Sequence, residues 1–509
     1  VYLFYVFKVL LYIWAWTWFC SFTPGLGSLS TIGEWWAEPI AFQKAVLWSL
    51  LFEVSGLGCA SGPLAGRYNP PIGGALHFLR PGTLKLPLFR GAPLIGGTRR
   101  SWTDVGFFAA LVASLIMALV SPTLGRDQLM PIAILLPILG VLDTTVFLTA
   151  RSEHYYTALI CFLFPADWIA GTKWLWAAIW IWAATSKLNR HFPSVIATMQ
   201  STSPITQLFP SIRKAMFVDY PNNLHPSRLA AVLAHFGTVV ELTVPVVLIV
   251  SGDPTVIWTA LFVMLAFHFF ITSSVPLGVP IEWNVMMVYG GFVLFGAYSN
   301  VSAFSIQSPL LIAYLVCAVF LLQLIGNMFP SKVSFLLSMR YYAGNWAYSV
   351  WLVRGNAADK LDERIKKPAR TPRAQLGDMY DENTVTAILS KVPVFRAMHI
   401  QGRILHELIP KAVDDIDAYE YHDGEAIAGL VLGWNMGDGH LHREGLLEAI
   451  QKECQFEEGE LRCIFVESQP IHRPYFAWRI YDAKTGLIDS GETSVKSLLP
   501  LQAWPDAAE

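Results

Sequence analysis

Apolar segments follow one another over the first two thirds of the chain, and most of them are long enough to cross a lipid bilayer. They run roughly over residues 1–22, 43–61, 104–121, 129–150, 155–187, 228–250, 254–276, 281–299 and 308–329. Backbone groups in hydrocarbon need internal hydrogen bonds, so such segments fold as helices of about 20 residues. The pattern predicts a mainly α fold, a polytopic transmembrane helical bundle of about 8–10 spans.

The composition agrees with a protein of the cell membrane. Only 15% of the residues are charged, against about 25% in soluble domains. No tail rich in Lys and Arg is present, and we expect membrane lipids as partners and no nucleic acid. The cysteines lack zinc-type spacing, and no metal site is expected. The chain begins with an apolar Val1, from which we infer a longer native N-terminus.

Three further parts complete the predicted organisation. Residues 1–330 form the transmembrane domain, which contains a basic loop rich in Gly and Pro at 63–103. The aromatic and basic pattern of 331–354 predicts amphipathic helices at the membrane interface. The rest of the segment 331–380 is charged and is expected to be a linker. Residues 381–509 predict a small soluble α+β domain that could dock a protein partner. In it we expect helices near 383–389 and 444–454, and strands at 426–434, 462–467 and 475–481.

Basic residues suggest how the chain is oriented. They gather in 63–103, in 190–228 and after 330, and the positive-inside rule places all three on the cytoplasmic side, together with the C-terminal domain. This requires 155–187 to cross twice or to enter and return. The loop 63–103 has two open interpretations: a cap whose arginines contact lipid phosphates, or a solvated loop.

Ionisable residues within the apolar segments are the best indication of function. Lys187, His235, Glu241, His268 and Glu282 lie inside or at the ends of such segments. A charge there costs about 2.5–3.5 kcal/mol on insertion scales, so these side chains need partners, a cavity or a reaction. For each of them a plainer interpretation stays open: Lys187 snorkels to the interface, His235 and Glu241 brace two helices, and His268 precedes a membrane-edge turn at 276–280.

The order of these residues resembles that of a known superfamily. The chain is similar to the horizontally transferred transmembrane domain, the best-known example of which is the vitamin K-dependent γ-glutamyl carboxylase. The matching residues are Ser186-Lys187-Leu188-Asn189, His235 with Glu241 six residues on, and Phe267-His268 followed by Gly278, Trp283 and Met286. The whole chain also resembles an uncharacterised actinobacterial membrane family of unknown function.

The carboxylase resemblance implies a role for one residue in particular. In the carboxylase, the lysine of this unit deprotonates a reduced quinone, and the resemblance places Lys187 there. Asn189 departs from the family pattern, where an acid follows the leucine. The large C-terminal region of the carboxylase is also missing, which argues against peptide carboxylation.

These observations lead to two functional hypotheses. The first is a membrane enzyme in which Lys187, His235, Glu241 and His268 transfer protons on a lipid-soluble substrate, such as a quinone, an isoprenoid or an acyl lipid; a quinone or isoprenoid is then the expected cofactor. The second is a non-catalytic membrane scaffold or accessory subunit, in which the same residues brace helices. Lipid transport is a third interpretation, for which no internal repeat is visible.

Overall fold

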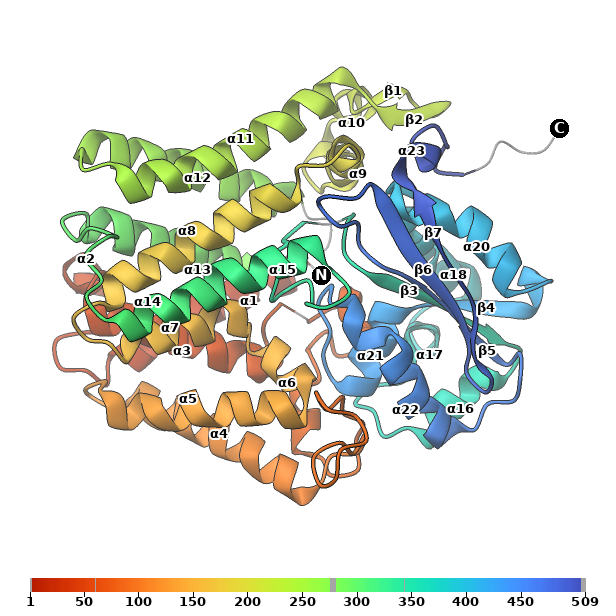
Figure 1. The fold of residues 1–509 in the computed structure, drawn as a ribbon, viewed down its shortest axis with the longest axis horizontal. Helices are drawn as coiled ribbons and strands as arrows, with labels where there is room; N and C mark the ends of the chain where they lie inside the picture. Colours follow the sequence, from red (N-terminus) through yellow and green to blue (C-terminus); the bar gives the residue numbers. More distant parts are fainter. Residues whose placement is uncertain (1, 60, 275–280, 343, 505–509) are drawn as a thin grey trace.

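The protein consists of a long helical bundle with an α+β unit against one end (Figure 1). We describe it from a computed structural model that covers residues 2–59, 61–274, 281–342 and 344–504. The predicted fold class, a helical membrane bundle followed by a small α+β domain, is confirmed. The principal bundle helices are α1 (Tyr2–Cys20), α3 (Pro39–Val54), α4 (Trp102–Val120), α5 (Arg126–Leu142), α7 (Thr157–Phe162), α8 (Trp168–Ser186), α11 (Arg228–Val250), α12 (Pro254–Ser274), α13 (Ile281–Gly291), α14 (Pro309–Val316) and α15 (Leu322–Met328).

Several of these helices are long and apolar enough to cross a membrane alone. Among the described residues, five stretches qualify: 3–20, 102–120, 228–250, 254–274 and 309–328. Helix α8 has 19 residues but is not apolar enough to qualify, and the remaining bundle helices are shorter. Helix α13 continues into a π-helical turn at Phe292–Ala297. Outward faces of the long helices carry large apolar side chains, such as Phe236 and Phe262, which are 65% and 59% exposed. Such a surface suits contact with lipid tails.

The bundle has two distinct ends. At the end that faces the α+β unit, Asn189 donates a hydrogen bond to Tyr342 at 2.6 Å. At the far end, Lys173 donates to the carbonyl oxygens of Tyr298 and Val301. Helices α7 and α8 pack against each other across the short turn at 163–167, so the chain reverses direction there. Segment 155–187 therefore contains two helices that run in opposite directions.

The α+β unit contains a five-stranded antiparallel sheet with strand order β4-β3-β5-β6-β7. Helices pack against both faces of this sheet (Figure 1). Its strands are β3 (Tyr348–Arg354), β4 (Tyr419–Asp423), β5 (Leu461–Val466), β6 (Tyr475–Asp482) and β7 (Gly486–Ser494). Its helices include α16 (Ala357–Arg364), α17 (Pro372–Gly377), α18 (Glu382–Leu389), α19 (Lys391–Met398), α20 (Leu405–Ala412), α21 (Gly424–Leu432), α22 (Glu444–Cys454) and α23 (Val495–Leu498).

Two sequence predictions about this unit are wrong. The segment expected to lie in the interface as amphipathic helices contains turns and the internal strand β3. Tyr348, Val350 and Leu352 face one apolar cluster, and Trp351 and Val353 face another. A strand buried on both faces is nearly continuously apolar, so its period-2 signal is weak. The sheet unit therefore starts at Tyr348, well before residue 381.

The other wrong prediction is the strand at 426–434, which is helix α21. All of its residues except Ala426 are buried. A short apolar run buried on every side does not distinguish helix from strand. Gly433 ends this helix with φ +90°, a left-handed conformation that glycine adopts without strain. The predicted helices at 383–389 and 444–454, and the strands at 462–467 and 475–481, are confirmed within one or two residues.

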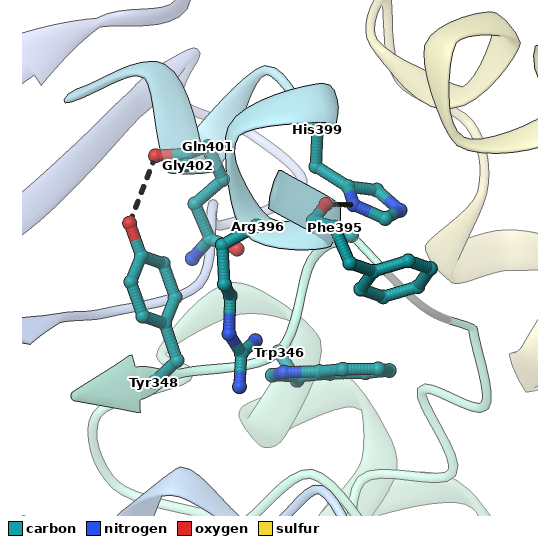
Figure 2. A pocket seen from close by; sticks show the side chains of 8 residues that line it. Trp346, Tyr348, Phe395, Arg396, His399, Gln401 and Gly402 are labelled. Carbon is teal, nitrogen blue, oxygen red and sulfur yellow. Dashed lines mark hydrogen bonds between the residues drawn. The ribbon is translucent and has the colours of Figure 1, made fainter. Parts of the chain in front are cut away.

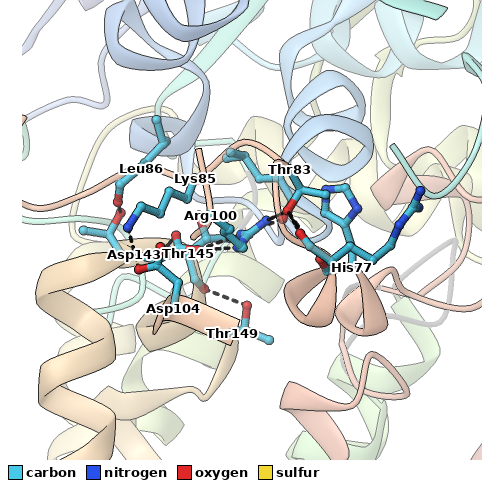
Figure 3. A network of polar contacts seen from close by, with 12 residues as sticks. His77, Thr83, Lys85, Leu86, Arg100, Asp104, Asp143, Thr145 and Thr149 are labelled. Carbon is cyan, nitrogen blue, oxygen red and sulfur yellow. Dashed lines mark hydrogen bonds and ion pairs between the residues drawn. The ribbon is translucent and has the colours of Figure 1, made fainter. Parts of the chain in front are cut away.

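The basic loop 63–103 joins the bundle to the sheet unit. Arg67 Nη2 donates to Gly429 O at 2.8 Å, and Arg100 Nη2 to Leu432 O at 3.3 Å, both on α21. Arg100 also pairs with Asp143 after α5, its Nη2 lying 2.6 Å from Oδ2 (Figure 3). Both arginines are buried. For these two residues, neither of the expected interpretations is correct, because they contact protein and not lipid phosphate or bulk water.

Candidate functional site

Lys187 and Glu241 form a buried ion pair inside the bundle. Lys187 caps the C-terminus of α8, and Glu241 lies in the middle of the adjacent α11. Lys187 Nζ donates to Glu241 Oε2, and the two side chains are 8% and 5% exposed. The rings of Phe192 and Phe267 lie 5.9 and 6.0 Å from Nζ. Lys187 therefore does not snorkel to the interface.

His268 lies on α12 and is held at both ring nitrogens. Trp180 Nε1 donates to His268 Nε2 at 2.9 Å, and His268 Nδ1 lies 2.7 Å from Asn284 Oδ1. An indole N–H can only donate, so Nε2 accepts, and Nδ1 carries the proton that it donates to Asn284. The ring is therefore a neutral imidazole in a defined tautomer and orientation.

His235 does not join this group. It is exposed on α11, next to the exposed Phe236, whereas Ala234, Thr238 and Glu241 form the buried face of the helix. A separation of six residues does not return to the same helical face. The structure thus brings Lys187 and Glu241 together, holds His268 on the neighbouring helix, and leaves His235 on the outside. The expected break at 276–280, with Gly278, lies outside the described residues.

The first turn of α13 links this region to a second buried polar cluster. Glu282 Oε2 lies 3.0 Å from Lys8 Nζ of α1, Trp283 Nε1 donates to His154 Nδ1 at 3.0 Å, and Asn284 holds His268. Three consecutive residues thus contact three different helical segments. A row of buried polar contacts therefore crosses the bundle near its α+β end.

The second cluster contains residues that sequence reasoning did not select. Arg151 Nε pairs with Glu153 Oε1 at 2.7 Å, and its guanidinium lies 5.2 Å from the Trp283 ring. Tyr341 OH also donates to Glu153 Oε1. The available signal was the polar run Arg151-Ser152-Glu153-His154 between two apolar segments, which is typical of a loop. In the structure it is buried and partly π-helical.

A shallow apolar groove lies between α11 and α12. It has a volume of ≈ 310 Å³ and is lined by Val244, Val247, Ala260 and neighbouring threonines. The groove starts about one helical turn beyond Glu241. Val244 and Glu241 both belong to the buried face of α11. The lining of the groove therefore ends about one helical turn short of Glu241, which is itself buried.

The sheet unit has a different kind of pocket, which its own side chains fill (Figure 2). The Arg396 guanidinium lies 4.7 Å from the Tyr348 ring and 5.5 Å from the Trp346 ring. It pairs with Asp423 at 3.1 Å. Burial lowers the pKa of the adjacent His399 to about 4. This arrangement positions β3 against α19 and leaves little room for a ligand.

His440 and His442, which the sequence places in a close His-x-His pair, have separate partners. His440 Nε2 lies 3.0 Å from Glu467 Oε2, and His442 Nδ1 lies 2.8 Å from Ser349 Oγ. His442 is buried and His440 is largely buried, so neither ring lies in an exposed surface loop. Each ring makes a structural contact within the sheet unit.

Comparison with known proteins gives one match. The sequence model of the family described as transmembrane protein of unknown function (DUF3556) matches residues 1–509. No curated protein and no solved structure matches the chain.

Proposed function

The chain belongs to this DUF3556 family of transmembrane proteins, and on that premise we propose that it is a membrane enzyme that moves a proton to or from a lipid-soluble substrate at Lys187. The observation that carries the proposal is the buried Lys187–Glu241 pair. Paired charges taken out of water are often no more stable than apolar residues of the same volume. A chemical role gives a reason to retain them.

The pair has the components of an acid–base device. When Glu241 accepts the proton of Lys187, both groups become neutral, and the free amine is a base. A neutral pair is favoured where the dielectric constant is low. His268 is already neutral and hydrogen-bonded at both nitrogens, so in this proposal it positions the site and does not relay protons. His235 faces the lipid side and has no assigned step.

The apolar groove beside α11 supports a lipid-soluble substrate. Its lining suits an isoprenoid or acyl chain, with the reactive head directed toward Lys187 and Glu241. The resemblance to the carboxylase-like domain favours a quinone head, because a lysine in the corresponding position deprotonates a reduced quinone. We propose the cytoplasmic side for the α+β end, where the basic segments gather.

The test compares a double variant with its two single variants in membranes. We expect Lys187→Met and Glu241→Leu singly to leave one buried charge and to lower the amount of folded protein. The double variant Lys187→Met/Glu241→Leu removes both charges and is expected to fold. The readout is the lipid profile of cells that lack the protein and are complemented with each form, measured by mass spectrometry.

The enzyme proposal expects the double variant to fold and to fail to restore the lipid profile. Lys173→Met is the matched control, since Lys173 is also a buried lysine of α8 but contacts two backbone carbonyls and the Phe295 ring at the far end. Each folded molecule of this control should retain activity. A folded double variant that restores the profile would overturn the proposal and favour the scaffold function, in which the pair only braces α8 against α11.

A further inference from the structure

Three potential metal ligands meet at the α+β end of the bundle. Glu53 lies in the last turn of α3, Cys59 follows in the next turn of chain, and Glu282 lies in the first turn of α13. Within the described residues, one ligand atom from each lies within 4.8 Å of the others. All three residues are at most 1% exposed.

An incompletely satisfied carboxylate points to a ligand in this cluster. Glu282 Oε1 accepts no hydrogen bond from the part of the chain that the structure describes. Its Oε2 has only the ion pair with Lys8. Buried oxygen atoms without a hydrogen bond are rare and commonly mark a bound ion or water. The carboxylate faces Glu53 and Cys59, so such an ion would lie between the three residues.

The charges around the cluster do not balance without a further cation or proton. Three carboxylates, those of Glu53, Glu153 and Glu282, lie among two cations, Lys8 and Arg151. If Cys59 becomes a thiolate and a divalent cation binds, the total formal charge becomes zero. Arg151 Nη1 already lies 3.4 Å from Cys59 Sγ, where it favours the thiolate.

The backbone is shaped to admit the Glu53 carboxylate. A Cβ at Gly58 would lie 2.0 Å from Glu53 Oε2, so only glycine leaves this space. The backbone N–H of Cys59 donates to Glu53 Oε2 at 2.9 Å, and Sγ donates to Oε1 at 2.9 Å. The turn after α3 thus holds the carboxylate and the thiol side by side.

From this arrangement we propose that Glu53, Cys59 and Glu282 bind one divalent metal ion of the zinc class. Two carboxylates and one thiolate are ligands that Zn²⁺ accepts at about 2.0–2.3 Å, and a fourth position stays open for water or a substrate atom. Binding releases the Cys59 thiol proton to solvent, and no oxidation or reduction occurs.

The experiment measures the metal content of the full-length protein purified without chelator. We expect close to one zinc per chain, by elemental mass spectrometry, in the wild type. Cys59→Ser and Glu282→Gln should lose it. Cys161→Ser is the matched control, because Cys161 is a buried cysteine of α7 outside the cluster; it should retain the metal.

Cobalt substitution provides a second readout that does not depend on the folding of the variants. A wild-type protein loaded with Co²⁺ should show a thiolate-to-cobalt charge-transfer band. A protein without stoichiometric metal after zinc addition, or a cobalt complex without the thiolate band, would overturn the proposal. The Lys187→Met/Glu241→Leu variant should keep its metal, so this result and the result of the lipid test are independent.

Discussion

Arg100→Met is expected to lower the free energy of unfolding by about 3–5 kcal/mol, because it leaves the buried Asp143 carboxylate without its partner. Arg100 Nε and Nη2 both contact Asp143 Oδ2, at 3.0 and 2.6 Å, and both side chains are 2% exposed. The same guanidinium reaches Thr83 and the carbonyl of Leu432. One residue therefore joins the bundle, the basic loop and the sheet unit (Figure 3).

The neighbouring residue provides a matched control. Arg99 pairs with Glu453, but its side chain is 63% exposed, and exposed pairs contribute about 0–1 kcal/mol. Arg99→Met should therefore change the midpoint of thermal unfolding in detergent little, whereas Arg100→Met should lower it clearly. Equal effects of the two substitutions would show that the Arg100 network does not hold the two parts of the protein together.

Acidification from pH 6.5 to about pH 5 is expected to destabilise the α+β end on the order of 4 kcal/mol per pH unit. Burial lowers the pKa of His77, His191 and His442 to about 3, and that of His399 to about 4. These folded-state values lie below the value of about 6.5 in an unfolded chain. The unfolded state therefore binds more protons, and stability present above pH 6.5 is lost as the pH falls.

A buried carboxyl opposes part of this loss. Burial raises the pKa of Glu425 to about 7, so this group favours the folded state as the pH falls from 7 to 4.5. The proton that Glu425 binds in the folded state offsets one of the four protons that the histidines bind in the unfolded state. The net difference is therefore about three protons. The low pKa of Glu467, about 2 beside His440 and Arg340, matters only in more acidic solution.

The measurement is the free energy of unfolding by denaturant at several pH values between 7.5 and 5. His77 Nε2 donates to Val431 O at 3.2 Å, a contact that a glutamine amide can also make. His77→Gln should therefore fold at pH 7.5 and should reduce the slope by about 1.4 kcal/mol per pH unit. A free energy that stays constant between pH 7 and 5 would contradict the expected acid sensitivity.

Local patterns predicted the elements whose signal lies within one segment. The apolar stretches of α1, α4, α11 and α12 are visible in the sequence because each is long and faces lipid. Helix α22 shows an amphipathic period, and the residues of strand β6 alternate between buried and less buried positions. Strand β3 and helix α21 were misjudged because burial on all sides removes the alternation that identifies an element.

The candidate site was predicted only in part, because a local signal identifies single residues and not the contacts between them. The cost of a charge in an apolar segment drew attention to Lys187 and Glu241, but their pairing joins residues that are 54 positions apart. His235 was selected by its spacing from Glu241 and lies on the other face of the helix. Of the Glu53, Cys59 and Glu282 cluster, the sequence singled out only Glu282, because the other two residues lie in segments far from it along the chain.

The amino-acid sequence by itself determines that this chain enters a membrane as helices and ends in an α+β unit, since hydrophobicity and turn chemistry act over neighbouring residues. Only the tertiary structure decides which charges meet. Those contacts depend on which face of each helix points into the bundle and on which helices become neighbours. Lys187 with Glu241, and Glu282 with Lys8 and Cys59, are therefore products of the folded bundle.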